Sequence, residues 1–141
     1  MKYLITILLL SSTICESFSQ TGKVIVTVKR VDLKKGGELS VGFFNDRNFP
    51  KVGKQSFGKA KEVDASVMEL VFENIPIGQY GIAVFQDIDG DKSLKTNFIG
   101  LPAEPIGFSN DAPIKFGPPS FADAKIDVEE DRTLNYVIQL R

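Results

Sequence analysis

Three aspartates at alternate positions, Asp87, Asp89 and Asp91, are the residues of this sequence best suited to chemistry. Calcium prefers six to eight oxygen ligands, and carboxylates at positions 1, 3 and 5 of a loop can surround one ion. The backbone carbonyl of Ser93 falls at position 7 of the same frame. The spacing therefore predicts a metal site formed by Asp87, Asp89, Asp91 and Ser93, with a weakly bound Ca²⁺ as a structural clamp.

The rest of this loop departs from an EF-hand. Position 6 is Lys92 instead of Gly, position 9 is Lys95, and position 12 is Phe98 instead of Glu. The favoured interpretation is nevertheless a hydrated turn without an ion, because Asp and Gly favour turns and water screens exposed charges. In that case Lys92 and Lys95 act as local counterions. A calcium site would need further oxygens from the loop that follows, and those available are Glu104, Asn110 and Asp111, with Asp123 beyond them.

Paired carboxylates also suggest glycoside hydrolysis, in which one acts as an acid and the other as a base or nucleophile. The acid normally lies against apolar walls. Glu104 stands between Ala103 and Pro105, so it could pair with an aspartate of the 87–91 turn in a small glycosidase-like hydrolase. The small size of the chain and its lack of Trp argue against this alternative. We therefore expect no enzyme, no catalytic residue and no cofactor-binding residue.

Composition excludes several kinds of site. From Gln20 onward the sequence has no Cys, His or Trp, which excludes disulfides, zinc–thiolate sites, Ser-His or Cys-His relays and a histidine pH switch. The whole chain has 17 basic and 18 acidic residues, and the basic ones form no stripe. Nucleic-acid binding requires a concentrated positive field, so we expect no nucleic-acid partner.

The first twenty residues have the layout of a secretory signal peptide. Lys2 precedes an apolar run at residues 4–10, and the small residues Ser17 and Ser19 come before a cut at Gln20. The apolar run is much shorter than the about 20 residues that cross a bilayer. A lipoprotein anchored through Cys15 is the alternative, which the preceding Ile14 does not favour. We predict a signal peptide at 1–19, a single domain at 20–141, and a secreted or periplasmic protein with no transmembrane segment after cleavage.

Alternating apolar residues predict a series of short strands. Val24, Val26 and Val28 share one face of the first segment, and Gly36 with Gly37 marks the turn into the next. No segment has the period of an amphipathic helix. This pattern is typical of an all-β fold, which we predict to be a seven-stranded antiparallel β-sandwich. The expected strands cover residues 23–31, 38–45, 59–65, 67–75, 79–87, 121–128 and 133–140.

The connection at residues 92–120 has no strand or helix period. A loop of this length is normally functional or disordered, and disordered segments are poor in aliphatic and aromatic residues. This one is rich in them, so we predict an ordered loop that packs on the sandwich. Phe108, Phe116 and Phe121 could line a small apolar pocket, although burial against the sheet is the favoured fate of such side chains. The apolar residues expected to pack are Phe98, Ile99, Leu101, Ile106, Phe108, Ile114 and Phe116.

From residue 80 onward the chain resembles DUF2141, a bacterial family of exported proteins. The matching text is "IPIGQYGIAVFQDIDGD", "TNFIGLPAEPIGFSNDA" and "FGPPSFADAKIDV". The resemblance implies a small exported β-sandwich, similar in outline to immunoglobulin-like or prealbumin-like domains, and it implies no activity. The chain departs from the family pattern at Gln86, where relatives tend to have His, at Lys92, where they have Gly, and at Lys95, where they have Asp.

Together these observations predict a non-catalytic binding or interaction module outside the cytoplasm. Its partner would be a protein or a glycan, and its one candidate site is the acidic turn beside the long ordered loop.

Overall fold

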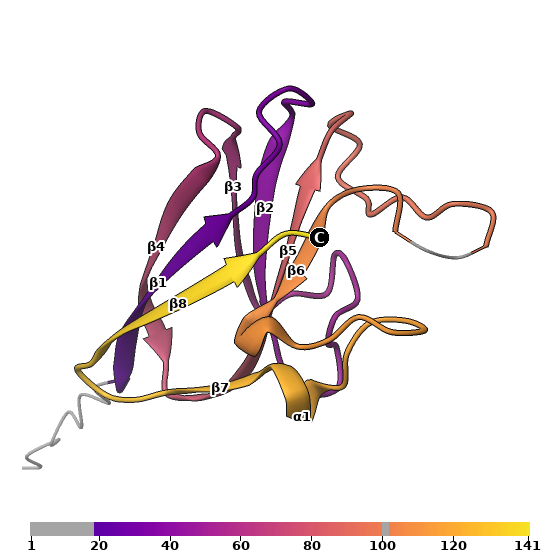
Figure 1. Cartoon of the computed structure of the whole chain (residues 1–141). Coiled ribbons are helices and arrows are strands. Elements are labelled where there is room, and N and C mark those ends of the chain that lie inside the picture. Colours follow the sequence, from indigo (N-terminus) through magenta and orange to yellow (C-terminus); the bar gives the residue numbers. More distant parts are fainter. Residues whose placement is uncertain (1–18, 100–101) are drawn as a thin grey trace, which may run out of the picture.

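The computed structural model describes residues 19–99 and 102–141, so residues 1–18 of the predicted signal peptide, the Cys15 alternative and Leu101 fall outside the described residues. The chain forms two facing β-sheets with one short helix (Figure 1). No helix in the described part of the chain is long and apolar enough to cross a membrane. The strands are β1 Thr21–Lys29, β2 Glu38–Phe44, β3 Phe57–Glu62, β4 Val67–Pro76, β5 Gly78–Asp87, β6 Ile106–Phe108, β7 Lys125–Val128 and β8 Thr133–Gln139, and the helices are the 3₁₀ turn η1 Ser109–Asp111 and α1 Phe121–Ala124.

Alternation produces the core between the sheets. One face of each long strand carries the apolar residues, and these faces meet in a single cluster. Phe43 of β2 is fully buried there, with its ring centroid 4.7 Å from that of Phe72 and 6.1 Å from that of Tyr80. The all-β prediction is confirmed, and the predicted segments at 23–31, 38–45, 67–75, 79–87 and 133–140 coincide closely with observed strands.

The two sheets differ in size and in strand direction. One has the order β4-β1-β8, and the other has the order β3-β2-β5-β6 with β7 also paired to β5. The purely antiparallel prediction is wrong in one place, because β8 runs parallel to β1. The chain leaves β7 in the larger sheet and crosses to the smaller one, and a crossover of this kind is what permits parallel pairing.

The seven-strand count is also wrong, because β6 and β7 are two pieces of one edge. Both pair antiparallel with β5, β6 opposite residues 83–85 and β7 opposite residues 78–81, and the segment 109–124 is inserted between them. The Ser109 hydroxyl bridges the break by accepting a hydrogen bond from the Ile82 N–H at 2.9 Å and donating to the Ala124 carbonyl. Ser109 is fully buried, so this side chain replaces the backbone partner that a continuous strand would supply.

The first half of the predicted strand at 121–128 is the helical turn α1. The Ser120 hydroxyl accepts a hydrogen bond from the Asp123 N–H at 3.2 Å, which caps the start of the turn. The strand begins only at Lys125. Capping therefore outweighed the weak alternation of "FADA".

The long connection packs on the body only in part. Ile106 and Phe108 are buried beside Phe44 and Phe49, as predicted for the loop, and Ala112 is buried with them. Other predicted packing residues, Phe98, Ile99 and Phe116, are instead strongly exposed, so the prediction is wrong for them. Thr96 pairs with Pro102, which makes a small hairpin that carries residues 97–99 away from the sheets; it projects to the right in Figure 1.

Candidate functional site

The acidic turn follows directly from the end of β5. Asp87 is fully buried, and one carboxylate oxygen from each of Asp87, Asp89 and Asp91 lies within 4.8 Å of the others. The Asp87 carboxylate accepts hydrogen bonds from the Gly90 N–H at 2.8 Å and the Lys92 N–H at 2.9 Å. Asp87 therefore organises the turn from inside, because it occupies backbone donors that have no strand partner.

The other two aspartates are exposed and hold a lysine. The Lys95 ammonium contacts the Asp89 carboxylate and lies 3.6 Å from Asp91 Oδ2. Asp91 Oδ1 also accepts from the N–H and the hydroxyl of Ser93, each at 2.9 Å. Lys95 thus stands beside the carboxylates that a cation would bind, as the counterion alternative expects.

Glu104 returns to this turn from the long connection. It is buried, and its two oxygens accept from the Ile88 N–H at 2.9 Å and the Lys95 N–H at 3.3 Å. Its role in this geometry is to tie the hairpin that begins at Lys95 to the end of β5. Both oxygens are engaged by backbone donors, which is the arrangement of a bracing carboxylate.

Asn110, Asp111 and Asp123 are not brought to the acidic turn. The Asn110 amide donates to the backbone carbonyls of Asp123 and Lys125 at 3.2 and 2.8 Å, next to α1 and β7. Asp111 Oδ1 lies 3.9 Å from Arg141 Nη2, beside the end of β8. The sequence-predicted ligand set therefore separates into a cluster of three aspartates with Ser93 and Glu104 nearby, and a second group that stabilises the insertion 109–124.

Gln86 is a structural residue at the same strand end. It is fully buried, and its side chain accepts from the Asp32 N–H at 2.9 Å and donates to the carbonyls of Asp32 at 2.8 Å and Gly36 at 2.7 Å. Next to it, Gly37 has a φ of 81°, and a Cβ there would lie 2.1 Å from the Asp87 carbonyl oxygen. The end of β5 thus fixes the turn at 32–37 through Gln86 and the acidic turn through Asp87.

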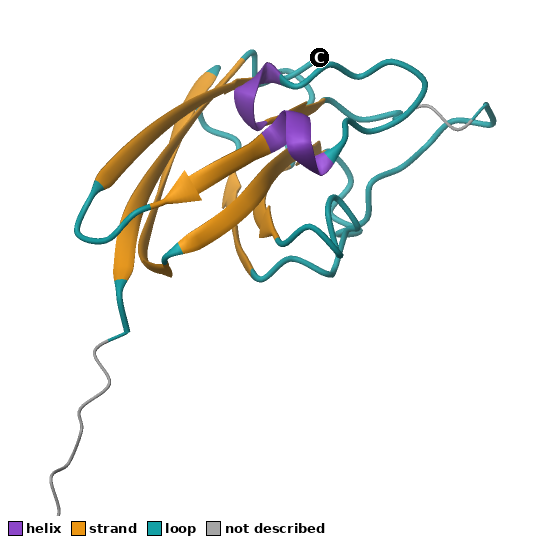
Figure 2. Cartoon of the chain, turned by 90° about the horizontal axis from the view of Figure 1, so that it is seen from below, coloured by secondary structure: helices purple, strands orange, loops and turns teal. Residues whose placement is uncertain are grey.

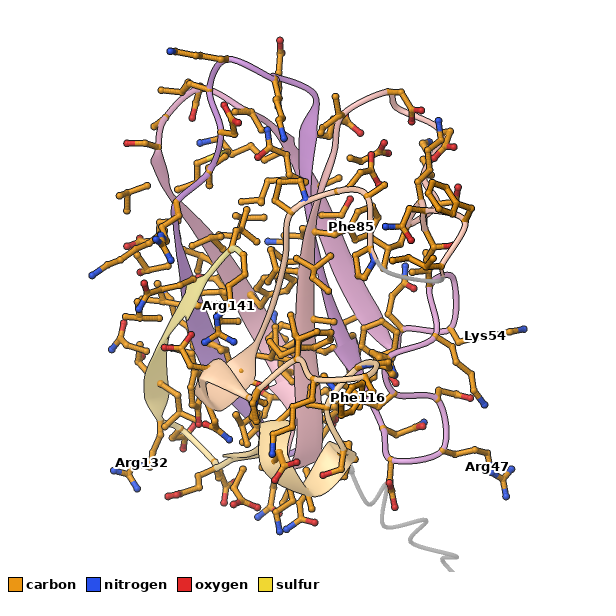
Figure 3. The ribbon with its side chains drawn as sticks, turned by 45° about the vertical axis from the view of Figure 1, so that its right-hand side comes forward. Arg47, Lys54, Phe85, Phe116, Arg132 and Arg141 are labelled. Atoms are coloured by element: carbon orange, nitrogen blue, oxygen red, sulfur yellow. The ribbon has the colours of Figure 1, made fainter. Side chains whose placement is uncertain are left out.

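The outer face of the larger sheet contains an apolar groove of about 810 Å³. Such a volume is typical of small-molecule sites, which span roughly 300–1,000 Å³. The groove lies between the loop at 45–56 and the connection at 92–118, and Figure 3 shows Phe85, Lys54 and Phe116 around this part of the molecule. Seen from below in Figure 2, the same two loops stand out on one side of the sheets.

Small side chains explain why the groove exists. The floor positions of β2, β3 and β5 point away from the core and carry little bulk, so the sheet surface is left low between the loops. Larger apolar residues, among them Phe85, Leu94 and Ile114, form the walls. The small floor residues are Ser40, Gly42, Gly58, Ala60 and Ala83.

Sequence reasoning missed this groove. Only Phe108 of the three residues considered for a pocket lines it, and Phe116 lies next to the lining residue Gly117. The signal was present in the strand alternation, because Leu39, Val41 and Phe43 face the core while Ser40 and Gly42 between them are small. A run of small residues at outward positions of neighbouring strands indicates an open surface.

The fold and site define a mostly β, two-sheet protein with a braced acidic turn and an apolar groove on the outer face of its larger sheet. A family model described as "Uncharacterized protein conserved in bacteria (DUF2141)" matches residues 26–135, so the chain belongs to this family. The resemblance noted from the sequence is thereby confirmed. No curated protein and no solved structure matches the chain.

Proposed function

We propose that this protein is a non-catalytic binding module and that the groove on the outer face of the larger sheet is its ligand site. The observation that carries the proposal is the groove itself, whose volume of about 810 Å³, apolar walls and small-residue floor suit an apolar ligand. Export to the periplasm or the exterior, and an immunoglobulin-like or prealbumin-like sandwich topology, are parts of the same proposal. The leader sequence supports the first, and two sheets packed around one core support the second.

A hydrolase that uses Glu104 and an aspartate of the turn is the competing function. No contact favours it: both Glu104 oxygens accept backbone hydrogen bonds, and Glu104 does not line the groove. Hydrolysis of a chromogenic glycoside that is lost in Glu104→Gln, with the fold intact by circular dichroism, would support the hydrolase and oppose a pure binding role.

The acidic turn has a structural part in this proposal. Ca²⁺ could enter only by displacing the Lys95 ammonium from Asp89 and Asp91, so binding would be weak, at about 10⁻⁴–10⁻³ M as in extracellular modules. Thermal melting in calcium and in chelator tests this clamp. At 100 times its dissociation constant, calcium adds about 2.7 kcal/mol to the free energy of unfolding. Equal melting temperatures in the two conditions would overturn the calcium clamp and leave the turn to its own hydrogen bonds and to Lys95.

The ligand site is tested with the neutral apolar dye Nile red, whose emission rises in apolar surroundings. We expect saturable fluorescence with wild type and about tenfold weaker binding in Ala60→Trp, because the added ring stands on the floor of the groove. Ala60 lies on the edge strand β3 and is exposed, so the larger side chain enters without disturbing the core.

Lys61→Trp is the matched control. Lys61 is the next residue of β3 and points to the other side of the strand. The Lys61→Trp variant should therefore bind the dye with the affinity of wild type. Absence of saturable dye binding to wild type, or equal loss in both variants, would overturn the groove as a ligand site.

A further inference from the structure

The acidic side chains around the groove are already engaged. Asp87 and Glu104 are buried and accept backbone hydrogen bonds. Asp89 and Asp91 share Lys95, and Asp111 lies beside Arg141. None of these carboxylates is among the residues that line the groove.

Several lysines around the groove have no such compensation. Lys51 and Lys92 line it, and Lys54 and Lys115 are next to lining residues. All four are exposed, and none forms an ion pair with a carboxylate of the described residues. Lys51 and Lys92 therefore place positive charge on the lining of the groove.

The other two charged residues on the lining are Lys59 and Glu38, and Lys51 with Lys92 still outnumber this single acid. Lys59 directs its ammonium away from the groove, to the Val71 carbonyl and the Phe72 ring, whose centroid is 5.2 Å away. Glu38 is half-buried at the start of β2 and is the only acid among the described lining residues.

The loops beside the groove also expose large apolar side chains. Phe98 and Phe116 are as exposed as in an extended peptide, at 101% and 105%, and Ile99 is 67% exposed. Exposed apolar area of this kind favours contact with an apolar partner. The surface thus combines an apolar channel, apolar tips and an excess of positive charge at the rim.

We infer that the ligand is a single-chain anionic amphiphile, such as a long-chain carboxylate. Its hydrocarbon chain lies in the groove over Ala60 and Ala83, and its head group pairs with the lysines at the rim. This inference rests on the proposed binding function and adds to it the chemistry of the ligand. An aliphatic chain suits the walls, and a single anionic head matches the uncompensated ammonium groups.

The experiment is displacement of Nile red by palmitate and by its neutral analogue hexadecanol. We expect palmitate to displace the dye at about one-tenth of the hexadecanol concentration, a ratio that falls as salt screens the lysines. In Lys51→Glu/Lys92→Glu this preference should disappear, when displacement by each competitor is compared within the variant at the variant's own affinity for Nile red. Lys34→Glu/Lys125→Glu, at two exposed lysines that do not line the groove, is the charge-matched control and should keep the preference.

The outcomes separate this inference from the function on which it depends. Dye binding without displacement by palmitate overturns the ligand class but leaves the groove as a binding site. Equal displacement by palmitate and hexadecanol overturns the role of the lysines. Failure of wild type to bind the dye overturns the proposed function itself.

An anionic lipid membrane presents the same chemistry as a free amphiphile, namely an anionic head group on a hydrocarbon chain. Vesicles of phosphatidylglycerol test it by co-flotation in the absence of free fatty acid. A free amphiphile as ligand predicts that the protein stays in the unbound fraction. Flotation that is lost in Phe98→Ser/Phe116→Ser would assign the apolar tips to a lipid surface and overturn the free amphiphile.

Discussion

The two faces of the five-stranded sheet are built in different ways. On the inner face, Phe43, Ile82 and Val84 are almost completely buried against the opposite sheet. On the outer face, Phe85 is only half-buried. This face is covered in part by two loops from distant parts of the chain, at 45–56 and 92–118. The inner face is closed by strands, whereas the outer face is closed at one end and open at the groove.

The closed end of the outer face is organised around one ring. Phe49, from the loop at 45–56, lies 5.8–6.1 Å between ring centroids from Phe44, Phe108 and Phe121. It packs directly on Gly81, where a Cβ would come within 2.6 Å of the ring. The same surface that is filled here by an aromatic side chain is left open farther along the strands. The difference teaches that stability is concentrated inside the sandwich, whereas the outer face keeps the open surface that the proposed binding function uses.

The largest expected effect tests this contrast directly. Phe43→Ala should lower the free energy of unfolding by about 3–5 kcal/mol, because it leaves a cavity in a closed core. Phe85→Ala removes the same ring from a half-exposed position, so we expect a loss of about 1–2 kcal/mol. Urea unfolding followed by circular dichroism measures both.

Nile red binding should change in the opposite order. The affinity for Nile red should change in Phe85→Ala, because this ring lines the groove. The Phe43→Ala molecules that remain folded should bind the dye with the affinity of wild type. Equal destabilisation by the two substitutions would show that the outer face is as closed as the inner one.

This contrast also explains what could be predicted from the sequence. Strict alternation, as in Val24, Val26 and Val28, identified the inner face and the boundaries of the long strands. The outer face depends on contacts between residues far apart in the chain, such as Phe49 on Gly81, and no local period reports them. The division of the last edge into β6 and β7 could not be predicted either, because Ser109 bridges it through a side chain.

The candidate site, like the fold, could be predicted from the sequence only where it depends on local spacing. The clustering of Asp87, Asp89 and Asp91 follows from local spacing, and it is present. The return of Glu104 to the turn was among the alternatives, but its use as an acceptor for two backbone amides depends on the tertiary path of the connection. For the same reason Asn110 and Asp111, close to Glu104 in sequence, lie with other partners.

The broken edge strand gives the next largest effect. Ser109→Ala leaves the Ile82 N–H without its acceptor in a buried position, so we expect a loss of about 1–3 kcal/mol in the free energy of unfolding. Ser120→Ala removes an exposed cap from the one-turn helix α1 and should cost about 1 kcal/mol or less. Hydrogen exchange at Ile82 should accelerate in the first variant and stay slow in the second. Unchanged exchange at Ile82 in Ser109→Ala would mean that the hydroxyl does not join the two half-strands.

The acidic turn should show a smaller effect. Asp87→Ala removes the acceptor of two backbone hydrogen bonds at the end of β5, and water can reach the exposed residues that donate them, so we expect a loss of about 1–2 kcal/mol. Asp89→Ala removes an exposed ion-pair partner and should cost under about 1 kcal/mol. Thermal melting in chelator distinguishes them. A larger loss in Asp89→Ala than in Asp87→Ala would show that the exposed pair with Lys95, and not the buried acceptor, holds the turn.

The smallest expected effect is a change in the free energy of unfolding with pH, caused by two tyrosines that pack in the core between the sheets. Burial raises the pKa of Tyr80 and of Tyr136 above 10.0, and the charges of Asp127 and Glu129 raise that of Tyr136 further. In the unfolded chain these phenols ionise near their ordinary pKa of about 10, so the folded state then holds more protons. Their contribution is therefore complete below pH 10 and is lost as the pH rises through the folded values. Tyr136→Phe should flatten the fall in stability between pH 9 and 11, measured by urea unfolding against wild type, which differs from the variant only in this phenol. Because salt screens Asp127 and Glu129 but does not change burial, high salt should reduce only part of the difference. A difference that vanishes entirely in salt would assign the shift to surface charge, and the phenol of Tyr136 would then not belong to the closed face of the sandwich.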